Sequence, residues 1–184
     1  MRRLFWMAAG LLTAIIVHAG LVLAVPALTL QRSLAGLAAA AGRNHFFIMK
    51  EADQAQLFPT YPRLSLVGAC AFDISGGPVD LAGNMPLGFW TLTIYSGSGD
   101  VLYAANDQQA GTNAFTLRLQ RAPGLLDMLK DQPNDESPVG SAWTVKTSEA
   151  TGLAVLWQPL PDAALRPQAE RIMAASACQA VQKN

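Results

Sequence analysis

The most constraining feature of the chain is an unbroken apolar run near its N-terminus. Residues 4–25 include only two polar side chains, Thr13 and His18. An α-helix rises about 1.5 Å per residue, so this run spans about 33 Å, enough to cross a hydrocarbon core about 30 Å thick. We therefore expect residues 4–26 to form a single membrane-spanning anchor.

A cleaved signal peptide is the alternative interpretation of the same run. The apolar core of a signal peptide is about 7–15 residues long and ends in a cleavage site of small residues. Here the run is longer, and the nearest small-residue site, Val25-Pro26-Ala27, contains a proline. The stretch Ala38-Ala39-Ala40 fits such a site but lies far downstream. These features favour a retained anchor.

The charges that flank the run indicate its orientation. Arg2, Arg3 and the terminal amine precede it, whereas Arg32 and Arg43 are the nearest cations that follow it. Loops rich in Lys and Arg tend to stay on the cytoplasmic side of a membrane. We therefore expect a cytoplasmic N-terminus and an extracytoplasmic remainder of the chain.

Downstream of the anchor, the sequence favours β-structure. Stretches with alternating apolar residues or many β-branched and aromatic residues are separated by turn sequences rich in Gly, Pro, Asn and Asp. The strand over 89–95 is expected to be central because it contains no proline, with Phe89 and Tyr95 on one face and Trp90 on the other. The predicted strands are 43–49, 64–72, 79–81, 89–95, 101–103, 114–119, 142–145 and 153–157.

Helices are expected at both ends of this β-rich region. Pro26 is a point where a helix can kink or stop, so the apolar spacing that follows predicts a separate juxtamembrane helix. The other expected segments are a short helix over 123–130, an acidic loop over 133–138 and a C-terminal helix over 162–182. The predicted fold class is mainly β, an antiparallel sandwich or open barrel with an N-terminal transmembrane helix and a C-terminal helix. The predicted division is 1–30 for the N-terminus and anchor, 31–42 for the juxtamembrane helix, and 43–184 for the extracytoplasmic domain.

The two cysteines, Cys70 and Cys178, both follow the anchor. Thiols outside the cytoplasm tend to oxidise, so a disulfide between them is expected. It would connect the strand over 64–72 to the C-terminal helix and close a loop of about 108 residues. Two buried free cysteines, packed as small apolar groups, are the alternative.

Composition argues against several functions. Thirteen basic and thirteen acidic residues give a formal charge of zero, which disfavours a nucleic-acid partner. His18 and His45 are the only histidines, which disfavours histidine-based catalysis and zinc or iron sites. No glycine-rich nucleotide loop and no C-x-x-C motif is present. No cofactor, metal or catalytic residue is assigned, and an enzymatic role is not favoured.

A few polar and aromatic residues form a candidate ligand or partner surface, namely Trp90, Tyr103, Asn106 and Asp107. Buried core and hairpin-end turn are the alternatives for Trp90 and for Asn106-Asp107. Paired carboxylates can perform acid–base catalysis, but the aspartates fall at expected turns and strand edges, where they usually bond local backbone. These aspartates are Asp73, Asp80, Asp100 and Asp107.

The patterns Asp73–Val79, Phe89–Tyr95 and Tyr103–Asp107 resemble an uncharacterised bacterial envelope family related to the domain-of-unknown-function family numbered 1254. Leu153–Trp157, followed by Pro161 and then Arg166-Pro167, extends the resemblance. It implies a small membrane-anchored β-protein and no chemistry, because these motifs are strand and turn signatures. With the orientation above, the anchor would cross the inner membrane once and place the domain in the periplasm.

Three functions remain open from the sequence. The first is a membrane-anchored interaction or accessory module, with the inner membrane and another envelope protein as partners. The second is a domain that binds a small apolar ligand in a pocket between the sheet and the C-terminal helix. The third is an Asp-based hydrolase or isomerase, with Tyr103 as a possible participant.

Overall fold

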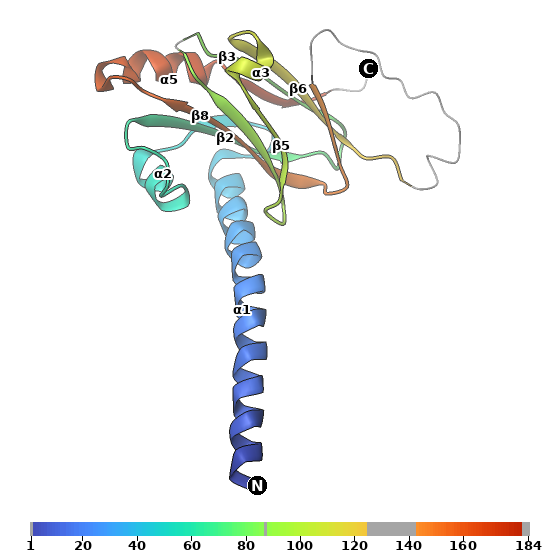
Figure 1. Ribbon diagram of the computed structural model, residues 1–184. Helices are drawn as coiled ribbons and strands as arrows, with labels where there is room; N and C mark the ends of the chain where they lie inside the picture. The colour runs from blue at the N-terminus through green and yellow to red at the C-terminus, as the bar shows by residue number, and fades with distance from the viewer. Residues whose placement is uncertain (1, 87, 125–142, 182–184) are drawn as a thin grey trace.

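The computed structural model describes residues 2–86, 88–124 and 143–181, and shows a β-rich domain from which one long helix projects (Figure 1). The helices are α1 (Arg2–Ala41), α2 (Glu51–Leu57), α3 (Asp107–Ala110) and α5 (Arg166–Ala174), with a 3₁₀ turn at Ala163–Leu165. The strands are β1 (Phe46–Ile48), β2 (Ser65–Asp73), β3 (Val79–Asn84), β4 (Thr91–Ser96), β5 (Val101–Asn106), β6 (Ala114–Arg121), β7 (Trp143–Thr147), β8 (Thr151–Pro159) and β9 (Ala177–Ala180).

The long helix α1 is continuous over 40 residues. The expected juxtamembrane helix over 31–42 is therefore not a separate element, since α1 passes through Pro26. A proline inside a helix removes one hydrogen bond and clashes with the carbonyl four residues earlier, a cost of about 3 kcal/mol that the helix bears here as it continues to Ala41. Gly42, with φ of +86°, ends it, as expected. The segment Arg2–Val25 is long and apolar enough to cross a membrane, and its apolar window is not buried against the domain.

The strands form two sheets. Sheet A has the order β1-β2-β8-β4-β5, and sheet B has the order β7-β6-β3-β9. The mainly β fold with helices at both ends is thus confirmed. The pairs are antiparallel except β6 with β7, which is parallel, contrary to an all-antiparallel fold. Parallel neighbours need a connection of a dozen or more residues, and residues 122–142 provide one.

The two sheets enclose the main hydrophobic core. Sheet A contributes Leu66, Cys70, Phe72, Leu92, Ile94, Ala154 and Leu156, and sheet B contributes Val79, Leu81, Phe115, Leu117, Leu119, Val145 and Cys178. Strand β8 occupies the middle of sheet A, whereas β4 lies beside it and also pairs with β5. The strand predicted to be central is therefore an interior strand, one position from the centre.

A second apolar cluster covers the opposite, outer face of sheet A. Its buried members come from β2, β8 and the chain just after β1, and α1, α2 and the segment after α2 pack against them. The buried members are Met49, Val67, Ala69, Leu153 and Val155, and the side chains packed on them include Leu37, Leu57, Phe58, Tyr61, Tyr95 and Trp157.

The C-terminal region differs from the single helix expected over 162–182. The helix α5 ends at Ala174, and Ala177–Ala180 forms β9, which pairs with β3. Alanine has the highest intrinsic helix propensity, but such propensities differ by less than about 1 kcal/mol per residue, so pairing with a sheet edge outweighs that preference here. The expected helix over 123–130, beyond its first two residues, and the acidic loop over 133–138 lie outside the described residues.

The predicted disulfide between Cys70 and Cys178 is present, with Cα atoms 6.4 Å apart. Because Cys178 lies on β9, the bridge connects the two sheets rather than a sheet and a helix. The disulfide is buried, since Cys70 is 0% and Cys178 is 5% exposed.

Candidate functional site

The predicted surface around Trp90 and Tyr103 is dispersed over different environments. Trp90 is 0% exposed and packs in the core with its ring 5.3 Å from that of Phe115, as its core alternative supposed. Tyr103 is half-buried, with its ring 6.0 Å from that of Trp143. Trp90 therefore offers no accessible ring to a partner.

Asn106 and Asp107 lie where β5 passes into α3. The Asn106 Oδ1 accepts the Gln109 N–H at 2.9 Å and caps the helix. The Asp107 N–H donates to the Trp90 carbonyl oxygen at 3.3 Å. Asn106 thus has the local turn role that competed with ligand binding in the sequence.

The other aspartates bond to separate neighbours. Asp80 binds Arg118 through two hydrogen bonds of 2.7 and 2.8 Å, which raises the pKa of that guanidinium. Asp100 accepts the Ser98 hydroxyl at 3.1 Å. Across the described ranges, no hydrogen bond joins two of Asp73, Asp80, Asp100 and Asp107. This arrangement does not form a carboxylate pair for acid–base catalysis.

The junction between α1 and the domain is fixed by side-chain bonds. Arg43 forms an ion pair with Asp73. Asn44, in the left-handed region at φ of 54°, donates its Nδ2–H to the Asp73 carbonyl oxygen at 3.0 Å and accepts the Asp73 N–H at 2.7 Å. Leu37, in the last turns of α1, packs on the outer face of sheet A. The helix is thus tied to the end of β2.

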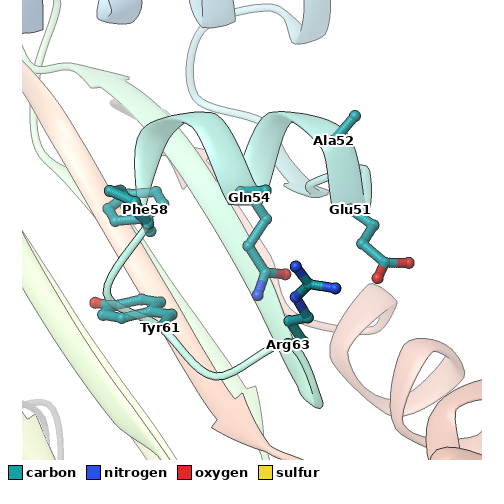
Figure 2. A pocket seen from close by; sticks show the side chains of 8 residues that line it. Glu51, Ala52, Gln54, Phe58, Tyr61 and Arg63 are labelled. Atoms are coloured by element: carbon teal, nitrogen blue, oxygen red, sulfur yellow. The ribbon is translucent and has the colours of Figure 1, made fainter.

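A pocket of about 440 Å³ lies between α2 and the segment that follows it (Figure 2). The helix is short for a local reason: acidic residues occupy its first turn, where they favour its start, and Pro59 and Pro62 follow its end and prevent it from continuing. The chain then turns back beneath the helix to enter β2. The lining residues, here called the α2 pocket, are Glu51, Ala52, Gln54, Ala55, Phe58, Pro59, Tyr61 and Arg63.

Gln54 connects α2 to the start of β2 by a buried hydrogen bond. It is 5% exposed, and its Nε2 donates to the Ser65 Oγ at 2.7 Å. The Ser65 hydroxyl in turn donates to the Pro62 carbonyl oxygen at 2.6 Å. This chain of bonds fixes the Gln54 amide, so its Oε1 is left as an acceptor.

An aromatic wall forms one side of the α2 pocket. Phe58 and Tyr61 stack with centroids 5.1 Å apart and planes 13° apart. The Tyr61 ring lies 5.3 Å from that of Trp157, which lies 5.9 Å from that of Phe89. Burial raises the pKa of the Tyr61 phenol, and the neighbouring Tyr95 adds to the rise.

The α2 pocket is also lined by one cation, Arg63, and one anion, Glu51. Arg63 and Glu51 are both exposed, and neither side chain has a hydrogen bond or ion pair with the part of the chain that the structure describes. The neighbouring Arg166 is engaged, since it donates to the Ser65 carbonyl oxygen at 3.4 Å and lies 3.8 Å from Glu170. The α2 pocket therefore combines one cation, one anion, one fixed amide and an aromatic wall.

Sequence reasoning missed the α2 pocket. Its lining comes from the stretch between the strands predicted over 43–49 and 64–72, for which no element was expected. The available signal was the sequence Phe58-Pro59-Thr60-Tyr61-Pro62-Arg63, in which aromatic residues, prolines and a cation alternate.

Comparison with known proteins supports the fold. No family model and no curated protein matches the chain. The crystal structure of the VPA0106 protein from Vibrio parahaemolyticus is similar, with a TM-score of 0.58 and 14% identity. The match covers 84% of this chain but only 39% of the Vibrio protein. An uncharacterised protein from Burkholderia cenocepacia has a TM-score of 0.46 at 13% identity, over 71% of this chain and 35% of that one. The first likeness supports the fold alone.

Proposed function

We propose that the protein is a membrane-anchored, extracytoplasmic interaction or accessory module of the bacterial cell envelope. The observation that carries this proposal is the continuity of α1, which runs from an apolar segment of membrane-spanning length into a junction bonded to sheet A. Figure 1 shows this helix projecting away from the β-domain. An anchor built in this way holds the folded domain on one side of the membrane.

The length of α1 also sets the distance between the membrane and the domain in this proposal. Residues 26–41 lie between the apolar segment and the junction, and at about 1.5 Å per residue they extend for about 24 Å. The polar headgroup layer is about 5–8 Å thick on each side of the hydrocarbon core. The helix would thus raise the domain above the lipid headgroups, where another envelope protein can reach it.

Two features support the periplasmic side of the inner membrane. Arg2 and Arg3 favour a cytoplasmic N-terminus. The buried disulfide between Cys70 and Cys178 fits an oxidising compartment. Membership of the envelope family related to the one numbered 1254 stays a prediction that would agree with this location.

A pair of fusions tests the topology. A phosphatase that folds only outside the cytoplasm, fused after Asn184, is expected to be active, whereas a fluorescent protein that matures only in the cytoplasm is expected to be dark there. The opposite pattern would contradict the proposed orientation. N-terminal sequencing of the mature protein that begins near Ala27 or Ala41 would contradict the anchor. Affinity purification from gently solubilised membranes then identifies the partner.

Binding of a small ligand is a second candidate function, and the α2 pocket favours it. Its volume of about 440 Å³ falls within the range of about 300–1,000 Å³ that is usual for ligand sites. It lies beside α2, not between a sheet and the C-terminal helix as the sequence suggested. Its lining also includes opposite charges, so a purely apolar ligand is not the best match.

A further inference from the structure

We propose that the α2 pocket binds a free α-amino acid with an apolar side chain. The proposal names the ligand class of the second candidate function above, on which it rests, and it does not depend on the orientation of α1. It rests on three groups that share one pocket, namely a guanidinium and a carboxylate that have no ion-pair partner among the described residues, and an aromatic wall. These match the carboxylate, the ammonium and the apolar side chain of one small zwitterion.

The carboxylate of this ligand would bind Arg63. A guanidinium presents planar N–H donors that match the two oxygens of a carboxylate. Arg63 lacks an ion-pair partner among the described residues, so its donors are available to the pocket. Figure 2 shows its side chain and that of Gln54 extending into the same space below α2.

The ammonium group is assigned to Glu51 and Gln54. Glu51 supplies a full negative charge, and the Gln54 Oε1 is an acceptor because the Gln54 Nε2 is already bonded to Ser65. An ammonium has three donors and no acceptor, so it requires acceptors of this kind. In the view of Figure 2, Glu51 lies on the opposite side of Gln54 from the aromatic residues.

The apolar side chain of the ligand is assigned to the aromatic wall. The stacked rings of Phe58 and Tyr61, with Pro59 between them in sequence, give an apolar surface at one end of the α2 pocket. Burial of apolar surface there would add to binding without a further polar group.

Charge balance explains why a zwitterion fits better than an ion of one sign. The lining carries one cation and one anion, and the nearby Arg166 and Glu170 offset each other. A simple anion would leave Glu51 without a partner and meet its repulsion, and a simple amine would do the same with Arg63. Like-charge contacts of this kind are a usual source of specificity.

Calorimetry on the detergent-solubilised full chain tests the proposal with three matched probes. L-phenylalanine carries both charges, 3-phenylpropionate lacks the ammonium, and phenethylamine lacks the carboxylate. We expect phenylalanine to bind and each of the other two to bind at least about tenfold more weakly, as the loss of one charge-assisted contact implies. Equal binding of 3-phenylpropionate or of phenethylamine would overturn the amino-acid assignment, as would no binding of phenylalanine at millimolar concentration.

Substitutions test whether Arg63 and Glu51 bind the two charged groups of the ligand. Arg63→Gln and Glu51→Gln are each expected to weaken phenylalanine binding at least about tenfold. Arg63→Gln is expected to leave the melting temperature unchanged because its side chain is exposed, whereas Glu51→Gln is expected to lower it slightly because Glu51 lies in the first turn of α2. Lys50→Gln is the matched control, since Lys50 is exposed, adjacent to Glu51 and outside the pocket lining. Equal losses in the Lys50 variant would show a diffuse charge effect and refute the site.

Discussion

The disulfide between Cys70 and Cys178 offers the sharpest test of the fold, because it is a covalent cross-link between strands of the two sheets. Its two cysteines are 108 residues apart in sequence. In the chain-entropy model a loop of this length loses about 16 cal/mol/K in the unfolded state, or about 4.8 kcal/mol at 25 °C. Residual structure in the unfolded chain makes this an upper value.

The expected consequence of removing the bridge is a large fall in thermal stability. For a domain of this size, 1 kcal/mol shifts the melting temperature by about 2–4 °C. The double variant Cys70→Ala/Cys178→Ala is therefore expected to melt up to about 10–20 °C lower than the wild type. Circular dichroism of the detergent-solubilised chain measures this, since β-structure dominates the domain. Wild-type protein in reductant is the matched control and is expected to melt close to the double variant.

Two results would refute this reasoning. The first is a double variant that melts within about 2 °C of the wild type, which would mean that the bridge does not constrain the unfolded chain. The second is the detection of two free thiols by alkylation under denaturing, non-reducing conditions. In the oxidised protein, mass spectrometry is expected to show a mass about 2 Da below that of the reduced form.

Other predictions concern the core and one carboxylate. Leu92→Ala or Ile94→Ala is expected to lower the free energy of unfolding by about 2–5 kcal/mol in urea titrations, since each side chain is at most 1% exposed; no change in either variant would contradict the position of β4. Gln158 is 0% exposed, and neither of its amide atoms has a partner among the described residues, so Gln158→Met is expected to raise stability by about 1–3 kcal/mol; a loss would show a paired amide. The pKa of Asp73 lies below its ordinary 3.8, chiefly because Ser75 donates to it. Because the folded-state pKa is lowered, the ionised carboxylate contributes stability above the unfolded pKa, and this contribution is lost as the pH falls through the folded pKa. Asp73→Asn is therefore expected to flatten the acid side of the melting-temperature profile; an unchanged acid side would contradict this.

Local patterns account for the strands that the sequence predicted correctly. In β6, Phe115, Leu117 and Leu119 alternate with polar residues, and all three are buried on the same side. A period of two residues is a property of the strand itself, so it can be recognised without knowledge of the neighbours. Just before β4, the same rule separated the buried Trp90 from the exposed Phe89.

Contacts distant in sequence account for the elements that were missed. The residues of β9 are alanine-rich and resemble the end of a helix, but they pair with β3, almost 100 residues earlier in the chain. The parallel pairing of β6 with β7 depends on a long connection, and no local pattern encodes it. Pro26 likewise predicted a break, because its effect on a helix depends on the bonds of the surrounding turns.

The candidate site was hidden for the same reason. Gln54 and Arg63 are ordinary polar residues in the sequence, and no motif connects them. Only the fold brings Gln54 against Ser65 and places Arg63 at the same pocket. Trp90, which does stand out in the sequence, is fully buried here. Whether a side chain is accessible to a ligand therefore depends on how the sheets pack, which no local sequence pattern shows.

The helix α1 and the α2 pocket share one face of the domain. Leu37 of α1 and both Phe58 and Tyr61 of the pocket wall pack on the same apolar cluster on the outer face of sheet A. Figure 1 accordingly shows α2 beside the upper end of α1. Since protein interiors are closely packed, a shift of the aromatic wall would displace the last turns of α1. The geometry thus places the candidate ligand site on the side of the domain from which α1 departs.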